Sequence, residues 1–185
     1  YTTTPDTTNF STVSSVFLGD NAGADATGAD YAVFLGTQAG QGATTADNSV
    51  FIGSNAGLNG TDSNAAVFIG SATGEGASNA DHSVFIGLTA GYAAISAQQS
   101  VFLGEGAGYG AANASSSVLI GYQAGALGGG MTGIGSNNII IGTNITLPDD
   151  TANTVNIGGA LFISGTYSDN TTGPLDVAVA GAKVG

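Results

Sequence analysis

The pentapeptide SVFIG at residues 83–87 recurs along the chain, with small changes, at a fixed interval. SVFLG stands at 15–19 and 100–104, AVFLG at 32–36, SVFIG at 49–53, AVFIG at 66–70 and SVLIG at 117–121. The valines of the seven copies are spaced 17 residues apart without interruption: Val16, Val33, Val50, Val67, Val84, Val101 and Val118. A fixed internal period of this kind is typical of architectures in which repeated units stack on one another.

The composition of the 185 residues narrows the function classes. There are 32 glycines, only 8% charged residues, no cysteine and a formal net charge of −12, with Lys183 as the one basic side chain besides histidine. Disulfides and thiolate metal sites are therefore excluded. Binding to nucleic acid or to anionic lipid requires clustered lysine and arginine, so the sequence predicts neither partner, and no apolar run is long enough for a membrane helix.

Two columns of the repeat are glycine in every copy. The column that ends the pentapeptide consists of Gly19, Gly36, Gly53, Gly70, Gly87, Gly104 and Gly121, and a second glycine follows four residues later in each unit. Invariable glycine marks backbone positions with positive φ or without room for a Cβ, which predicts a corner at the end of each pentapeptide. The Val-Phe-Ile run before that corner predicts a short strand.

The rest of each unit has small residues at a spacing of three, as in Gly40, Ala43, Ala46 and Ser49. This spacing fits neither a strand nor a helix, and it indicates an extended wall in which every third side chain faces a narrow interior. One unit per coil of a parallel β-solenoid satisfies these features, with equivalent strands in register about 4.8 Å apart. The fold class predicted is therefore all-β.

The two faces of the predicted strand are both apolar. Valine and isoleucine or leucine share one face and phenylalanine occupies the other, whereas the return path of alanine and glycine is sufficient to cover only one of them. Six phenylalanines in a row would expose on the order of 900 Å², above the roughly 300–600 Å² of the largest patches on soluble monomers. We therefore predict an oligomer interface made of Phe17, Phe34, Phe51, Phe68, Phe85 and Phe102. The alternative is a monomeric solenoid with the same phenylalanines in its own core.

The repeat resembles the head repeats of trimeric autotransporter adhesins, whose units read S-V-A-I-G. It is more similar still to glycine-rich repeats of bacteriophage tail fibres and bacterial surface fibre proteins, and the resemblance covers residues 15–125. It implies a left-handed parallel β-roll, three chains packed side by side, and a coil core formed by the valine column given above. The family's small middle residue is phenylalanine in six of the seven units and Leu119 in the seventh, which is a departure from its pattern.

The spacing of the repeat changes after Gly125. The stretch NIIIG at 138–142 follows the preceding unit by 21 residues instead of 17, and strand-like patches occur at 145–147 and 161–163. We predict an N-terminal cap or linker over residues 1–14, a solenoid of seven coils over 15–131, a β transition or cap over 132–167, and an extended linker to a further downstream part over 168–185.

The sequence predicts no catalytic residues and no cofactor. His82 is the one histidine, and it occupies the same repeat position as Asn48 and Gln99, as expected for surface decoration; GGGMTGIG at 128–135 lacks the lysine of a phosphate-binding loop. One candidate metal site is a column of stacked acidic residues, Asp30, Asp47 and Asp81, interrupted by Asn64, since Ca²⁺ would relieve the repulsion between carboxylates. The competing interpretation of this column is a solvated acidic edge.

These observations lead us to expect a non-enzymatic structural segment of an extracellular fibre, a phage tail fibre or a bacterial adhesin. It would be a homotrimer that attaches to a host surface or glycan receptor, and its exposed tyrosines Tyr31, Tyr92, Tyr109 and Tyr122 are candidate contacts. The alternative is a monomeric solenoid that stacks end to end into a filament or binds an ice or glycan surface. An ice-binding array is disfavoured because the column Thr27, Thr44, Thr61 continues as Ser78, Ile95 and Ala112.

Overall fold

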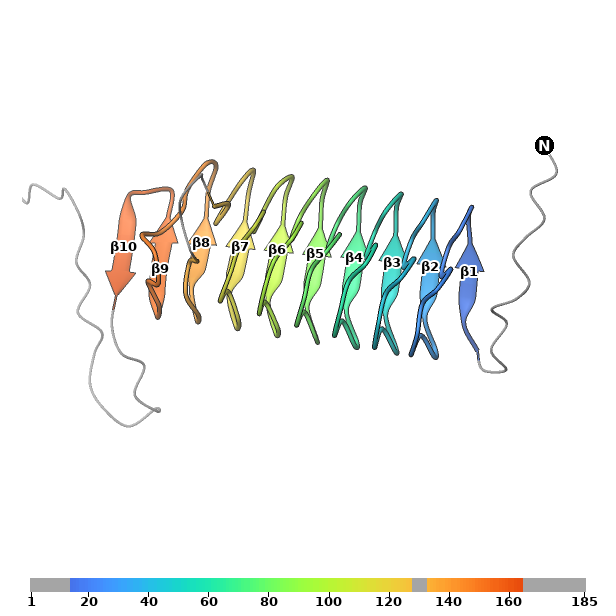
Figure 1. Cartoon of the computed structure of the whole chain (residues 1–185). Helices are drawn as coiled ribbons and strands as arrows, with labels where there is room; N and C mark the ends of the chain where they lie inside the picture. The colour runs from blue at the N-terminus through green and yellow to red at the C-terminus, as the bar shows by residue number, and fades with distance from the viewer. Residues whose placement is uncertain (1–13, 128–132, 165–185) are drawn as a thin grey trace, which may run out of the picture.

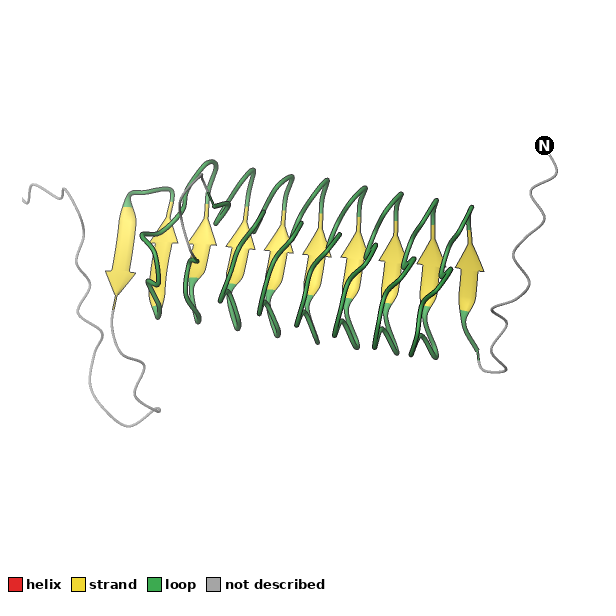
Figure 2. Cartoon of the chain, viewed as in Figure 1, coloured by secondary structure: helices red, strands yellow, loops and turns green. Residues whose placement is uncertain are grey.

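The computed structural model describes residues 14–127 and 133–164, and these form one parallel β-solenoid (Figure 1). Ten strands lie in a single sheet in chain order. They are β1 (Val16–Leu18), β2 (Val33–Leu35), β3 (Val50–Ile52), β4 (Val67–Ile69), β5 (Val84–Ile86), β6 (Val101–Leu103), β7 (Val118–Ile120), β8 (Ile139–Ile141), β9 (Thr154–Ile157) and β10 (Leu161–Ser164). Figure 2 shows that each coil contributes one strand to the same wall and passes through loops on the others.

The strands are in register, as the 17-residue period predicts. Val33 pairs with Val50, Phe34 with Phe51 and Leu35 with Ile52, and the same pairing repeats along the stack. A second, narrower ladder of isolated bridges on another wall begins Thr27 to Thr44 and ends Ile95 to Ala112. Equivalent residues of successive coils therefore lie beside one another on every wall.

The parallel stack has about eight turns, one more than predicted. β8 pairs with β7 in parallel despite the longer spacing, β9 pairs with β8 in parallel, and only β10 runs antiparallel to its neighbour. The strand expected at 145–147 is wrong, because this segment lies on the return path of its coil with Leu147 in the interior, and β9 was not foreseen. The expected terminal linkers fall mainly on 1–13 and 165–185, outside the described residues.

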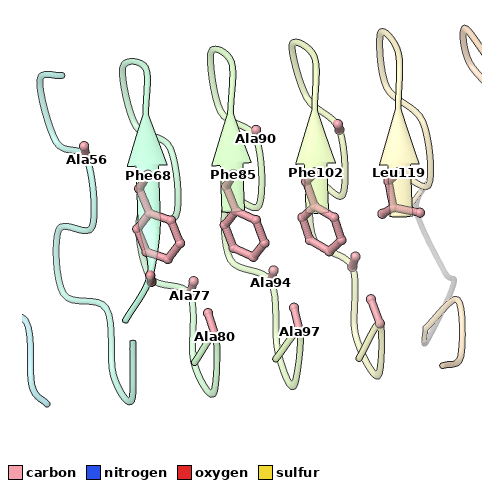
Figure 3. Packing of buried hydrophobic residues seen from close by; sticks show 14 of the residues in the cluster. Ala56, Phe68, Ala77, Ala80, Phe85, Ala90, Ala94, Ala97, Phe102 and Leu119 are labelled. Atoms are coloured by element: carbon pink, nitrogen blue, oxygen red, sulfur yellow. The ribbon is translucent and has the colours of Figure 1, made fainter. Parts of the chain in front are cut away.

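The phenylalanine column is inside the coil, contrary to the predicted interface. The side chains of Phe34, Phe51, Phe68, Phe85 and Phe102 are fully buried within one chain. Successive rings stack with centroids 4.4–4.9 Å apart and interplanar angles of 3–11°. Figure 3 shows the rings side by side in successive coils, with alanines of the return path around them and Leu119 continuing the column.

The valine column, which the resemblance assigns to the coil core, instead faces outward. In β6, Phe102 is 0% exposed while Val101 and Leu103 are 37% and 42% exposed. The physical reason is the width of the coil. Alanine at Ala43 and Ala46 reduces the opposite walls to methyl groups, so the interior accommodates one large side chain from the middle of the strand. The flanking strand residues must then face outward.

The two glycine columns have different causes. Gly70 has φ +135, and a Cβ there would come within 2.5 Å of the carbonyl oxygen of Gly87 in the next coil. Gly74 has φ +63, and a Cβ there would come within 2.5 Å of the ring of Phe68 in its own coil. The first glycine therefore permits the stacking of coils, and the second makes room for the phenylalanine.

Buried serines join consecutive coils beside the strands. The hydroxyl of Ser83 donates to the carbonyl oxygen of Ala97 at 2.7 Å and accepts from the N–H of Ser100 at 3.1 Å. In the longer coil, Asn138 takes this position, and its side chain donates to the carbonyl oxygen of Thr151 at 2.7 Å and accepts from the N–H of Thr154 at 2.9 Å. These bonds satisfy backbone groups that the narrow interior hides from water.

Candidate functional site

The outward face of the sheet is a band of aliphatic side chains that no other described residues cover, and we call this band the aliphatic strip. Its members alternate with the buried core residues along the strands β1–β9. They are Val16, Leu18, Val33, Leu35, Val50, Ile52, Val67, Ile69, Val84, Ile86, Val101, Leu103, Val118, Ile120, Ile139, Ile141, Val155 and Ile157. Some are exposed, as is Leu18 at 70%, and most are half-buried by their neighbours.

The strip is long, narrow and without charge. Nine strands at the usual spacing give a length of about 38 Å. With two side chains per strand, its area is on the order of 400 Å². An area of this size lies within the roughly 300–600 Å² of the largest apolar patch on a soluble monomer, and such patches are often functional. Because the chain carries a net charge of −12, the absence of any carboxylate from the strip sets it apart from the rest of the surface.

A second candidate is a groove with a cavity volume of about 550 Å³ on a different wall, beyond the glycine corner. It crosses four successive coils near the C-terminal end of the solenoid. Its lining consists of Thr89, Glu105, Gly106, Tyr109, Gln123, Ala126, Leu127, Asn144 and Thr146. We call these residues the groove. Tyr109 was among the tyrosines singled out from the sequence, but the rest were missed because their repeat columns are variable.

Backbone hydrogen bonds between coils hold the main chain of the groove residues in place. The N–H of Gln123 donates to the carbonyl oxygen of Glu105, and the N–H of Asn144 donates to that of Tyr122, both at 2.8 Å. Gln123 and Asn144 occupy equivalent positions in successive coils, where the backbone is in the left-handed region with φ of 52° and 51°. The ring of Tyr109, which is 44% exposed, stacks on Tyr92 with centroids 5.0 Å apart and planes inclined by 7°.

The acidic column proposed as a cation site forms hydrogen bonds between successive coils. The carboxylate of Asp47 accepts from the N–H of Asp30, and that of Asp81 accepts from the N–H of Asn64, both at 2.8 Å. Each carboxylate thus caps the backbone of the preceding coil. Within residues 14–127 and 133–164, no three histidine, cysteine, aspartate or glutamate side chains lie together as a metal site would require.

The other residues considered for chemistry are separate from the groove. His82 and Tyr31 are exposed at equivalent left-handed corners, with φ of 57° and 58°. The bridged column carries hydroxyls only as far as Ser78, because the next coils have Ile95, which is 51% exposed, and Ala112 at this position. A regular hydroxyl array therefore covers only part of that wall.

Comparisons of the chain with known protein families, curated proteins and solved structures find no match. What the structure defines is the fold class, a β-solenoid repeat protein of about eight turns of about 17 residues. Within the part of the chain that the structure describes, there is no helix with the length and apolar character to cross a membrane.

Proposed function

We propose that this chain is a non-enzymatic structural segment of an extracellular fibre, in which copies pack side by side through the aliphatic strip. The observation that carries the proposal is the strip itself, a flat band of aliphatic side chains along strands β1–β9. Covering it removes apolar surface from water and gains about 25 cal/mol per Å². The stacked backbone hydrogen bonds supply the stiffness that a fibre segment requires.

Three copies are the assembly that the repeat supports best. The pentapeptide and its following glycines resemble the head repeats of trimeric adhesins and the repeats of tail fibres. The contact differs from the one first expected from the sequence, because Val67, Ile69 and their equivalents are available to a neighbouring chain while the phenyl rings are enclosed. Attachment to a host surface would be the role of such a fibre.

The alternative of monomers stacking end to end has less support. A filament of this kind continues most simply when parallel strands meet at each junction. β10 runs antiparallel to β9 and lies at the end of the described sheet, so it breaks the parallel pattern that β1 of a following copy would extend. Strands placed this way at the end of a sheet blunt edge-to-edge association.

The solution mass of residues 1–185, measured by light scattering after size exclusion, tests the proposal. We expect a mass of three chains. Replacing Val67 and Val84 with lysine should reduce it to one chain, because a charge in a desolvated interface is costly. A matched variant with lysines at the exposed positions Ser54 and Ser71 carries the same change in charge outside the strip and should keep the wild-type mass.

The two variants are compared at equal concentration with their circular dichroism spectra, so that loss of fold is distinguished from loss of assembly. A wild-type mass of one chain at tens of micromolar would contradict the proposal. So would an unchanged oligomer in the Val67→Lys, Val84→Lys variant.

A further inference from the structure

We infer that the groove binds an uncharged oligosaccharide. The inference goes beyond the proposed function and does not depend on it, because the groove lies past the glycine corner, on a different wall from the aliphatic strip. It rests on the shape of the cavity, on unpaired polar side chains within it, on an exposed aromatic ring and on the charge of its surroundings.

The amide side chains of the groove differ from their equivalents in two earlier coils. There the equivalent amides pair with a side chain of the same wall: Gln38 donates to Gln41 at 2.8 Å, and Asn55 donates to Glu75 at 3.4 Å. Among the described residues, the side-chain amides of Gln123 and Asn144 have no such partner. Both residues line the cavity and are exposed, so their amide donors and acceptors are available to a ligand.

The aromatic ring provides an apolar surface beside these polar groups. Tyr109 is exposed and backed by the ring of Tyr92, which fixes its orientation. A sugar ring has an apolar face of C–H groups and a rim of hydroxyls, so it matches a tyrosine ring flanked by amides and hydroxyls. Thr89 and Thr146 also line the groove, and the hydroxyl of Thr89, which donates to the carbonyl oxygen of Leu88 at 2.8 Å, can still accept a hydrogen bond. A rigid ring of this kind gives contact area at a small entropic cost.

The charge of the groove selects against anionic ligands. Its one ionised side chain is that of Glu105, and no lysine or arginine lies among residues 14–127 or 133–164. A phosphate, sulfate or sialic acid would therefore meet a carboxylate without a compensating cation. Glu105 instead accepts hydrogen bonds from hydroxyls.

The backbone of the groove disfavours an extended peptide as the ligand. Recognition by strand addition needs free N–H and C=O groups along an edge. Here the N–H of Gly106 donates to Leu88 at 2.8 Å and that of Leu127 donates to Tyr109 at 3.0 Å, so these groups are used within the solenoid. Recognition is thereby left to side chains. The four coils span about 14 Å along the stack, a length that accommodates a short oligosaccharide rather than a monosaccharide.

The test uses the full chain and an immobilised panel of uncharged oligosaccharides together with sialylated and sulfated ones. We expect binding confined to uncharged members. The strongest binder is then titrated into the ¹⁵N-labelled protein. Maltotriose, cellotriose and triacetylchitotriose are titrated in parallel. The backbone signals of Gly106, Tyr109, Gln123 and Asn144 should shift.

Two variants use residues that the repeat already accepts at the same positions. Tyr109→Ala introduces the residue found at Ala24 and Ala126, and Gln123→Ala the residue found at Ala72, so both should keep the fold. Each should weaken binding about tenfold or more, as removal of a central contact does. Tyr31→Ala is the matched control, since it removes an exposed tyrosine outside the groove and should bind like wild type.

The possible outcomes decide the inference. Loss of binding in the groove variants with retention in Tyr31→Ala supports it. No binding to any uncharged oligosaccharide, binding only to the anionic members, or equal loss in Tyr31→Ala overturns it. The solution mass of Tyr109→Ala should equal that of wild type, so failure of this inference is distinguishable from failure of the side-by-side assembly.

Discussion

The middle residue of each strand determines how wide the coil is. Phe68 fills the space between the strand and the alanines of the return path, and its ring contacts the rings of the coils on either side at centroid distances of 4.7 and 4.9 Å. Offset or parallel stacks of aromatic rings add to the stabilisation from burial alone. Leucine at position 119 shows that a smaller branched side chain also fits at this place.

Replacing this ring should reveal that it is enclosed within one chain. Phe68→Ala is expected to lower the free energy of unfolding by about 3–5 kcal/mol, because it leaves a cavity in the coil. Phe68→Leu is the control and should cost much less. Urea unfolding followed by circular dichroism measures both. An unfolding free energy unchanged in Phe68→Ala, with a lower oligomer mass, would instead place the ring at an interface between chains.

The element that turns the chain after each strand contains glycines of invariant and of variable repeat positions, and these differ in what surrounds them. Gly70 lies against the backbone of the next coil, so an added methyl group has nowhere to move. Gly76 is also left-handed, with φ +65, but an added Cβ would meet no atom within 4 Å, and Ala93 occupies the equivalent position in the next coil. Position in the repeat, rather than φ alone, therefore determines whether a glycine can be replaced by alanine.

Two alanine substitutions in the same coil separate these effects. Gly76→Ala should cost about 1 kcal/mol, the strain of a left-handed alanine. Gly70→Ala adds a clash with backbone that cannot be relieved without separating two coils, so we expect a several-fold larger loss. Thermal unfolding of the two variants gives the comparison. Equal losses of stability in the two variants would show that conformational strain alone explains the requirement for glycine at position 70.

The whole molecule is a stack in which each coil contacts its two neighbours. Stability in such a protein is close to a sum of terms for single coils and for the interfaces between them. Each interface term is retained only where neighbouring coils stay in register. A shift of one residue would place phenylalanine outside and valine inside, because strand side chains alternate.

Deletions within the stack test this view. Removing residues 66–82 takes out one complete repeat of 17 residues and joins Ala65 to Ser83, an equivalent junction. We expect a folded protein with an unchanged circular dichroism spectrum per residue. Removing residues 66–81 leaves one residue too many between strands. This deletion should lower the unfolding midpoint substantially more than the deletion of residues 66–82 does. Similar midpoints for the two deletions would contradict a register-dependent stack.

Much of this architecture was determined by the sequence alone. The period, the strands at each Val-Phe-Ile run, the corner glycines and the inward spacing of Gly40, Ala43, Ala46 and Ser49 all follow from local steric rules that a repeat makes visible. Tyr109 was recognised as a possible contact. The other groove residues were not, because they come from variable columns of four different coils and only stacking brings them together.

Only the tertiary structure decided which face of the strand is the interior. Alternation establishes that Val67 and Ile69 oppose Phe68, but it is symmetrical and does not say which side the chain closes around. That choice depends on the distance between the strand and the return path, where the alanine methyl groups leave room for one phenyl ring in each coil. The valines and isoleucines were thereby turned outward, into the strip that the proposed fibre uses.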